Sequence, residues 1–102
     1  MARLIVLYKT PKDPAAFDTY YVQTHIPIAK EIPGLRKYEV SRGPVGSPGG
    51  PSNVHLVAIL HFDDMKAIHA AFASPEGKMA AADVQKFASG GVEMLMFDDR
   101  EV

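Results

Sequence analysis

The segment Val54–Phe62 is apolar on both of the faces that a β-strand would present. Its even-numbered residues are all hydrophobic, and its odd-numbered ones are His55, Val57, Ile59 and His61. Side chains of a strand point alternately to opposite faces of the sheet. A strand that is apolar on both sides needs a covering layer on each face. We expect the even-numbered residues to meet helices and the odd-numbered ones to face a second layer.

The rest of the chain supplies three further strand segments and two helical regions. Asp13 is placed to cap a helix that begins at Pro14, because its carboxylate accepts from free backbone N–H groups. Asp63 or Asp64 is placed to cap a second helical region, which restarts at Ser74 and ends at the glycine pair 90–91. The expected strands are residues 3–9, 35–42, 54–62 and 92–98, and the Gly- and Pro-rich segment 43–52 is expected to be a loop.

This β-α-β-β-α-β order predicts an α+β ferredoxin-like fold, built as a single domain over residues 1–102. Its four strands would form an antiparallel sheet with both helices on one face. Two helices cover only one face, and the other apolar face would exceed the patch that soluble monomers usually expose. The simplest cover is a second copy packed sheet to sheet. We therefore expect a homodimer that forms an α+β barrel.

Charge and composition narrow the classes of function. The formal net charge is −1, so no basic footprint for nucleic acid is present. The chain has no cysteine, which excludes disulfides, thiolate nucleophiles and Cys-ligated metals. The longest apolar run near the start, residues 4–8, is too short for a signal peptide, and no segment is long enough to span a membrane. We expect a cytoplasmic protein by elimination, with neither a nucleic-acid nor a membrane partner.

His25 precedes Pro27 by two residues, at the end of an amphipathic helix pattern. Proline removes the donor that the carbonyl of Gln23 would use, and it disfavours the α conformation at Ile26. We expect the helix to break there and leave His25 at a broken helix end, beside a cleft between helix and sheet. In one interpretation His25 is a general acid/base. In the other, its imidazolium donates to a freed carbonyl at the negative end of the helix.

Several other side chains are candidates for the same site. Tyr21 lies four residues before His25 and would be its neighbour on the helix, so we expect these two residues to be catalytic. The expected substrate-binding residues are Tyr20, Tyr38, Arg36 and His55. We expect no metal site, since His55 and His61 would lie about 20 Å apart along one strand. His69 is expected on a helix surface or in packing.

Four motifs carry a resemblance to a known family. They are Phe17-Asp18, the pair Tyr20-Tyr21, His25-Ile26-Pro27 and Pro33-Gly34-Leu35-Arg36. With the preceding LYKTPKD they resemble the EthD family, named for ethyl tert-butyl ether degradation. The resemblance implies a dimeric ferredoxin-like barrel with no tight cofactor. Members are associated with ether-degrading monooxygenase systems, and relatives in the superfamily include isomerases and cofactor-free monooxygenases.

Two functions remain open on the sequence. The first is a cofactor-independent enzyme (an oxidoreductase, isomerase or lyase) acting on a small apolar metabolite, with a role in ether or xenobiotic degradation. His25 would move a proton, a tyrosine would hold the substrate oxygen, and the walls would exclude water. The second is a non-catalytic binding or accessory protein of a monooxygenase system, because no nucleophile–base pair or carboxylate dyad is evident.

Overall fold

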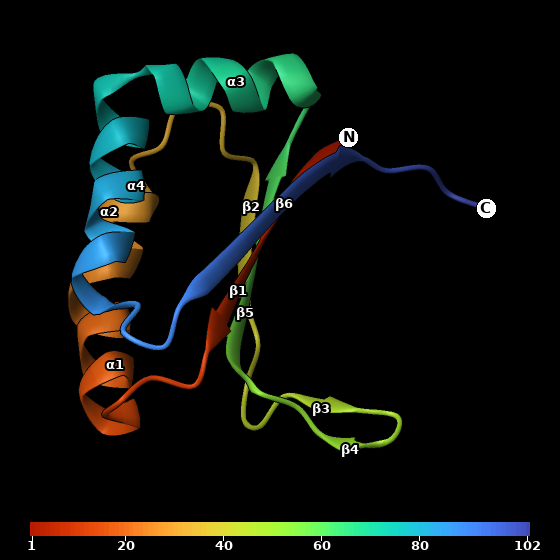
Figure 1. The fold of residues 1–102 in the computed structure, drawn as a ribbon. Coiled ribbons are helices and arrows are strands. Elements are labelled where there is room, and N and C mark those ends of the chain that lie inside the picture. The colour runs from red at the N-terminus through yellow and green to blue at the C-terminus, as the bar shows by residue number, and fades with distance from the viewer.

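The computed structural model describes residues 1–102, and its elements follow the expected order. The strands are β1 (Ala2–Lys9), β2 (Lys37–Val40), β3 (Gly46–Ser47), β4 (Gly50–Pro51), β5 (Val54–Phe62) and β6 (Val92–Asp98). The helices are α1 (Pro14–Tyr20), the π-helical turn η1 (Tyr21–His25), α2 (Ile26–Ala29), α3 (Met65–Ala73) and α4 (Pro75–Phe87). Four strands form an antiparallel sheet in the order β2-β5-β1-β6, and all helices lie on one side of it (Figure 1). The fold is therefore α+β and ferredoxin-like.

The core lies between the helices and the sheet face that they cover. Along β1 the side chains alternate strictly, with Leu4, Val6 and Tyr8 buried and their neighbours half-buried. In β5 the even-numbered Ala58, Leu60 and Phe62 are buried on the same face, as the alternation predicted. The expected helix-facing set of β5 is thus confirmed over its second half.

At the start of β5 the alternation breaks at a β-bulge. Tyr8 pairs with Leu56 but Lys9 pairs with Val54, so His55 is the extra residue and has no partner on β1. Cross-strand partners share a face, so Val54 lies with Lys9 on the open face. The bulge re-aims His55, whose ring packs edge-on against Phe17 of α1 at 5.0 Å. The expectation that His55 faces the second layer beside His61 is therefore wrong.

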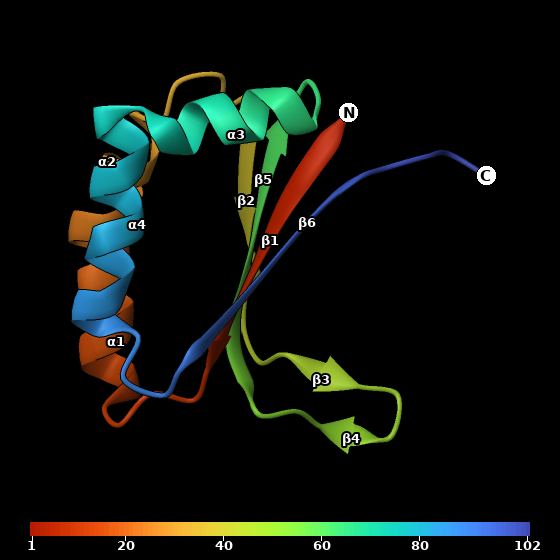
Figure 2. The ribbon, with the colours of Figure 1, turned by 45° about the horizontal axis from the view of Figure 1, so that its top comes forward.

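The opposite face of the sheet is open in the single chain, as Figures 1 and 2 show. Its middle row pairs Ile59, Ile5 and Leu95 across β5, β1 and β6. Leu95 and Phe97 are each more than two-fifths exposed. At one end of this face His61 lies between Arg3 and Glu39, with its Nε2 2.7 Å from a Glu39 oxygen. An uncovered and largely apolar sheet face is what the sequence predicted.

The first helix continues past Pro27 instead of breaking. Ile26 has helical φ and ψ of −56° and −48°, and its N–H donates to the carbonyl of Tyr21, five residues back. This wide π turn gives the ring of Pro27, which would clash with the carbonyl four residues earlier, room inside the helix. The expected break at His25 is therefore wrong, and His25 lies within a continuous helix.

The helical region after β5 divides into α3 and α4 at Ser74. Asp64 caps α3, since its Oδ1 accepts from the N–H of Ala67 at 2.7 Å. The hydroxyl of Ser74 caps α4 by accepting from the N–H of Gly77 at 3.0 Å. A Cβ on Gly77 would lie 2.0 Å from the carbonyl oxygen of Ala71, so only glycine lets the two helices meet so closely. In Figure 2, α3 crosses the end of the sheet while α4 runs beside α1 and α2.

Residues 43–52 contain more structure than the expected loop. β3 and β4 pair as a small hairpin that projects on the side away from the helices (Figure 2). No helix in the structure combines the length and the hydropathy that crossing a membrane requires.

Candidate functional site

A cavity of about 440 Å³ lies between the sheet and the helices. This volume is within the range of small-molecule sites. Nineteen residues line it, and seventeen of them are hydrophobic. The other two are His25 and His69. The cavity can therefore hold an apolar molecule and offers it very few polar groups.

His25 reaches the cavity from η1 and is held by a carboxylate on α4. Its Nδ1 lies 2.9 Å from Oδ2 of Asp83, and both residues are buried. The other carboxylate oxygen of Asp83 accepts from the hydroxyl of Tyr20 at 2.7 Å. Three residues from two helices thus form one hydrogen-bonded chain, Tyr20–Asp83–His25. The chain fixes the position of the imidazole ring.

The pKa shifts in this chain set the protonation states at neutral pH. Burial raises the pKa of Asp83, but hydrogen bonds from Tyr20 and His25 outweigh it, and the pKa of this carboxyl lies below its usual value. Burial lowers the pKa of His25, and the attraction of Asp83 opposes this only in part. The state that results is an ionised Asp83 and a neutral His25. Nδ1 then carries the proton and donates to Asp83, which leaves a lone pair on Nε2.

Nε2 of His25 is available to a molecule in the cavity. It has no hydrogen-bond partner in the protein, and no fully buried side-chain nitrogen or oxygen is left without one. Nε2 is therefore exposed to the space that the ring lines. A neutral imidazole with an oriented Nδ1–H and a free Nε2 is suited to accept a proton.

Tyr21 lies beside His25 and is itself in contact with Tyr8 and Tyr38. The ring of Tyr21 lies 5.2 Å from that of His25, and the ring of Tyr8 lies 5.6 Å from that of Tyr21. The hydroxyls of Tyr21 and Tyr38 are 2.5 Å apart. Burial raises the pKa of all three hydroxyls, so they stay protonated. The hydroxyl of Tyr8 also interacts with that of Tyr21. Three hydroxyls joined by two hydrogen bonds leave one polarised O–H for an oxygen of a ligand.

The structure brings together only some of the residues that the sequence indicated. His25, Tyr21 and Tyr38 line the cavity. Tyr20 does not line the cavity, and its hydroxyl donates to the Asp83 carboxylate that also binds His25. Arg36 is exposed and makes a two-pronged ion pair with Asp63, at 2.8 and 3.0 Å.

His55 also lies outside this cavity. Its Nε2 is 2.7 Å from a carboxylate oxygen of Asp18 on α1. The pair borders a second, more open hollow between the first helix and the β3–β4 hairpin. Neither Arg36 nor His55 is therefore among the residues that line this cavity.

Asp83 and Tyr8 belong to the site although the sequence did not single them out, and His69, expected on a helix surface or in packing, is exposed on α3 and also lines the cavity. Asp83 carried a readable signal, because it has the same helix-face spacing as three apolar residues that are buried. These residues are Ala80, Val84 and Phe87. A carboxylate on a buried helix face requires a partner. Tyr8 has no comparable signal, since an aromatic residue in a strand is ordinary packing.

No cluster of three or more His, Cys, Asp or Glu side chains has an arrangement that could hold a metal ion.

Comparison with known proteins connects this site to a family. Residues 9–91 match the EthD domain family. An uncharacterised 11.0 kDa protein from the thcB–thcC intergenic region of Rhodococcus erythropolis is 41% identical over 102 residues, which cover 100% of this chain and 98% of that protein. The crystal structure of an EthD family protein from Bacillus halodurans is 38% identical and superposes with a TM-score of 0.89, covering 98% of this chain and 99% of that one.

More distant structures share the fold. A variant of SnoaB, a cofactor-independent oxygenase from Streptomyces nogalater, is 21% identical with a TM-score of 0.68, covering 99% of this chain and 94% of that one. A dimeric ferredoxin-like protein of unknown function from Thermobifida fusca is 14% identical with a TM-score of 0.69, covering 94% and 88%. The domain match extends over most of the sequence, and two relatives exceed 35% identity. This chain therefore belongs to the EthD family.

Proposed function

We propose that this protein catalyses proton transfer on a small, largely apolar metabolite that carries a ketone or phenol oxygen. The observation that carries the proposal is the pairing of two features at one place in an apolar cavity. The first is Nε2 of His25, held as a proton acceptor by Asp83. The second is the hydroxyl cluster of Tyr8, Tyr21 and Tyr38, which retains one free donor. Base and donor are the two groups that enolisation requires.

The geometry supports a sequence of steps for the protein's own residues. Nε2 of His25 removes a proton from the carbon next to the substrate carbonyl, and Asp83 stabilises the imidazolium that forms. The hydroxyl cluster donates to the oxygen on which negative charge develops. The apolar walls exclude water and strengthen both interactions. The resulting enolate is the shared product of this first stage.

The fate of the enolate decides the reaction class. If a carbon–carbon double bond adjoins the deprotonated carbon, return of the proton from the His25 imidazolium to the far end of the dienolate is an isomerisation. If the neighbouring carbon carries a hydroxyl group, the enolate expels it and the imidazolium protonates it, so that it leaves as water, which is a dehydration. In an oxygenation the carbanion bonds to dioxygen, which is the oxidant, and the imidazolium protonates the peroxide that forms. The hydroperoxide then loses water, together with the second hydrogen of that carbon, and a carbonyl remains. SnoaB is described as a cofactor-independent oxygenase, so this fold accommodates oxygenation without a cofactor in a distant protein. All three begin with His25 as the base.

We also propose that the protein acts as a homodimer through the open sheet face. The support is the apolar row around Leu95 and the description of a structural neighbour as dimeric. Packing two such faces together would give each sheet the second layer that its composition requires.

Deuterium exchange tests the proton-transfer proposal without knowledge of the natural substrate. The purified protein is incubated in D2O with a panel of small ketones such as 2-tetralone, and deuterium uptake next to the carbonyl is followed by mass spectrometry. We expect the wild type to accelerate uptake above the buffer rate, and His25→Asn to lose about 100-fold or more of that acceleration. Asp83→Asn should also lose most of it, because an amide donates to Nδ1 and places the proton on Nε2.

His55→Asn is the matched control, since His55 pairs with Asp18 and lies outside this cavity. Circular dichroism confirms that each variant is folded. Full acceleration by a folded His25→Asn variant would contradict the proposal. Ligand binding by the wild type without any exchange would favour the alternative, a non-catalytic binding or accessory protein beside a monooxygenase.

A further inference from the structure

His69 differs from every other histidine in the chain. His25, His55 and His61 each pair with a carboxylate, contributed by Asp83, Asp18 and Glu39. His69 has no such partner, although it lines the cavity. Both of its ring nitrogens are therefore free to bind a ligand.

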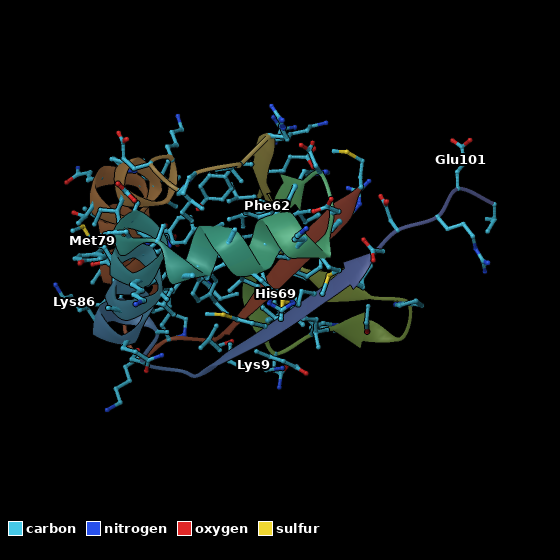
Figure 3. The ribbon with its side chains drawn as sticks, turned by 90° about the horizontal axis from the view of Figure 1, so that it is seen from above. Lys9, Phe62, His69, Met79, Lys86 and Glu101 are labelled. Carbon is cyan, nitrogen blue, oxygen red and sulfur yellow. The ribbon has the colours of Figure 1, made fainter.

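His69 lies at the mouth of the cavity. Most lining residues are buried or half-buried, and the exposed ones mark where the cavity meets solvent. These are His69, Ala73, Ala81, Met94 and Met96, from α3, α4 and β6. Figure 3 shows α3 lying across the sheet, with His69 on the side of β6. A ligand that enters between α3 and β6 must pass His69.

The mouth of the cavity offers a ligand one polar side chain and otherwise apolar ones. His69 is the only residue there with a hydrogen-bonding side chain, since the other exposed lining residues are alanines and methionines. No Asp or Glu lines the cavity, and the ionised Asp83 lies behind His25 at the reacting end, so no carboxylate is in contact with a ligand at the mouth. An imidazole donates a hydrogen bond to a carboxylate and attracts it electrostatically when protonated.

We propose that His69 selects ligands that carry a carboxylate at the end remote from the reacting oxygen. This inference rests on the proposed function, because the reacting end is placed at His25 and the Tyr21–Tyr38 pair. The substrate class is then an amphipathic acid, with an apolar body in the cavity, a ketone or phenol at its inner end, and a carboxylate held at the mouth.

Three matched phenols test the assignment. They are 2-naphthol, 6-hydroxy-2-naphthoic acid and 6-hydroxy-2-naphthamide, which share the ring and the inner hydroxyl and differ at the far end. Calorimetric titration measures the dissociation constant of each with the wild type, His69→Leu and His69→Lys. We expect the wild type to bind the acid about fivefold to tenfold more tightly than 2-naphthol or the amide, as for one partly exposed charge-assisted hydrogen bond.

His69→Leu should bring the ratio of acid to amide close to one, and His69→Lys should restore a preference for the acid. A carboxylate preference that survives in His69→Leu overturns the proposal, as does equal binding of acid and amide by the wild type. His25→Asn separates this result from the proton-transfer proposal. It should lose deuterium exchange and keep the preference for the acid, so each hypothesis can fail without the other.

Discussion

His25 depends for its chemistry on Asp83, which lies 58 positions away in the sequence. The spacing of Tyr21 and His25 predicted that these two rings are neighbours, and the structure confirms it. That contact is local, since residues four apart on a helix lie one above the other. The contact with Asp83 depends on how two helices pack, which no spacing within either helix reveals. Half of the site was therefore accessible to sequence reasoning, and the half that sets the protonation state was not.

The lowered pKa of His25 predicts a loss of stability in mild acid. The unfolded histidine binds a proton near its ordinary pKa of 6.5, whereas the folded one binds it only at lower pH. As the pH falls below 6.5, the unfolded chain gains protons that the folded chain does not, so the free energy of unfolding decreases. The slope from one such group is at most about 1.4 kcal/mol per pH unit.

Urea midpoints at about pH 7.5 and 5.5 measure this effect. The wild type should be less stable at the lower pH, and His25→Asn should show a smaller difference between the two. Asp83 acts in another window, because its lowered pKa removes stability only below its ordinary value of 3.8. An identical pH dependence in wild type and His25→Asn would show that His25 is not the group responsible.

Among the elements, the junction of α3 and α4 restricts the residue type most strongly, at Gly77. Alanine is normally favoured over glycine in a helix by about 1 kcal/mol. At Gly77 the opposite should hold, since an added Cβ meets the carbonyl of Ala71 at 2.0 Å and the helices would have to separate. We expect Gly77→Ala to destabilise the protein by about 2 kcal/mol or more, measured by urea unfolding.

Gly49→Ala is the matched control, because nothing lies within 4 Å of its added Cβ. Its effect should stay within about 0.5 kcal/mol. A Gly77→Ala variant as stable as the wild type would mean that α3 and α4 are less tightly packed than the structure shows. Because α4 carries Asp83, any separation of the two helices should also weaken deuterium exchange.

The elements also show where local sequence rules succeed and where they do not. The caps at Asp13 and Asp64 follow from residue type and position, and both form as predicted. Pro27 was expected to end a helix, yet the π turn before it absorbs the ring. At His55 one extra residue reverses the faces predicted by alternation. In both cases one additional residue, in the π turn or in the β-bulge, shifts the positions that follow it. Rules that assume a fixed helical or strand spacing do not account for such a residue.

At the scale of the whole molecule, the open sheet face predicts the state of assembly. We expect sedimentation to give twice the 11.1 kDa mass of one chain. Leu95→Lys should yield a monomer, because it would bury two like charges in a symmetric interface. Met94→Lys is the control, since Met94 is the next residue on β6 and lines the cavity on the opposite face. A wild type that is monomeric at micromolar concentration would contradict the homodimer.

The strand order has a consequence for how the protein comes into being. Of the four strands of this sheet, β1 is made first and occupies an interior position, but one of its two neighbours is β6, which is made after the other three. During synthesis the edge of β1 that pairs with β6 stays unpaired until β6 is made, and more than 80 residues separate the two strands. Met94 and Met96 close the cavity only when β6 arrives. Binding capacity should therefore appear late and all at once during synthesis, with no partly active shorter chain along the way.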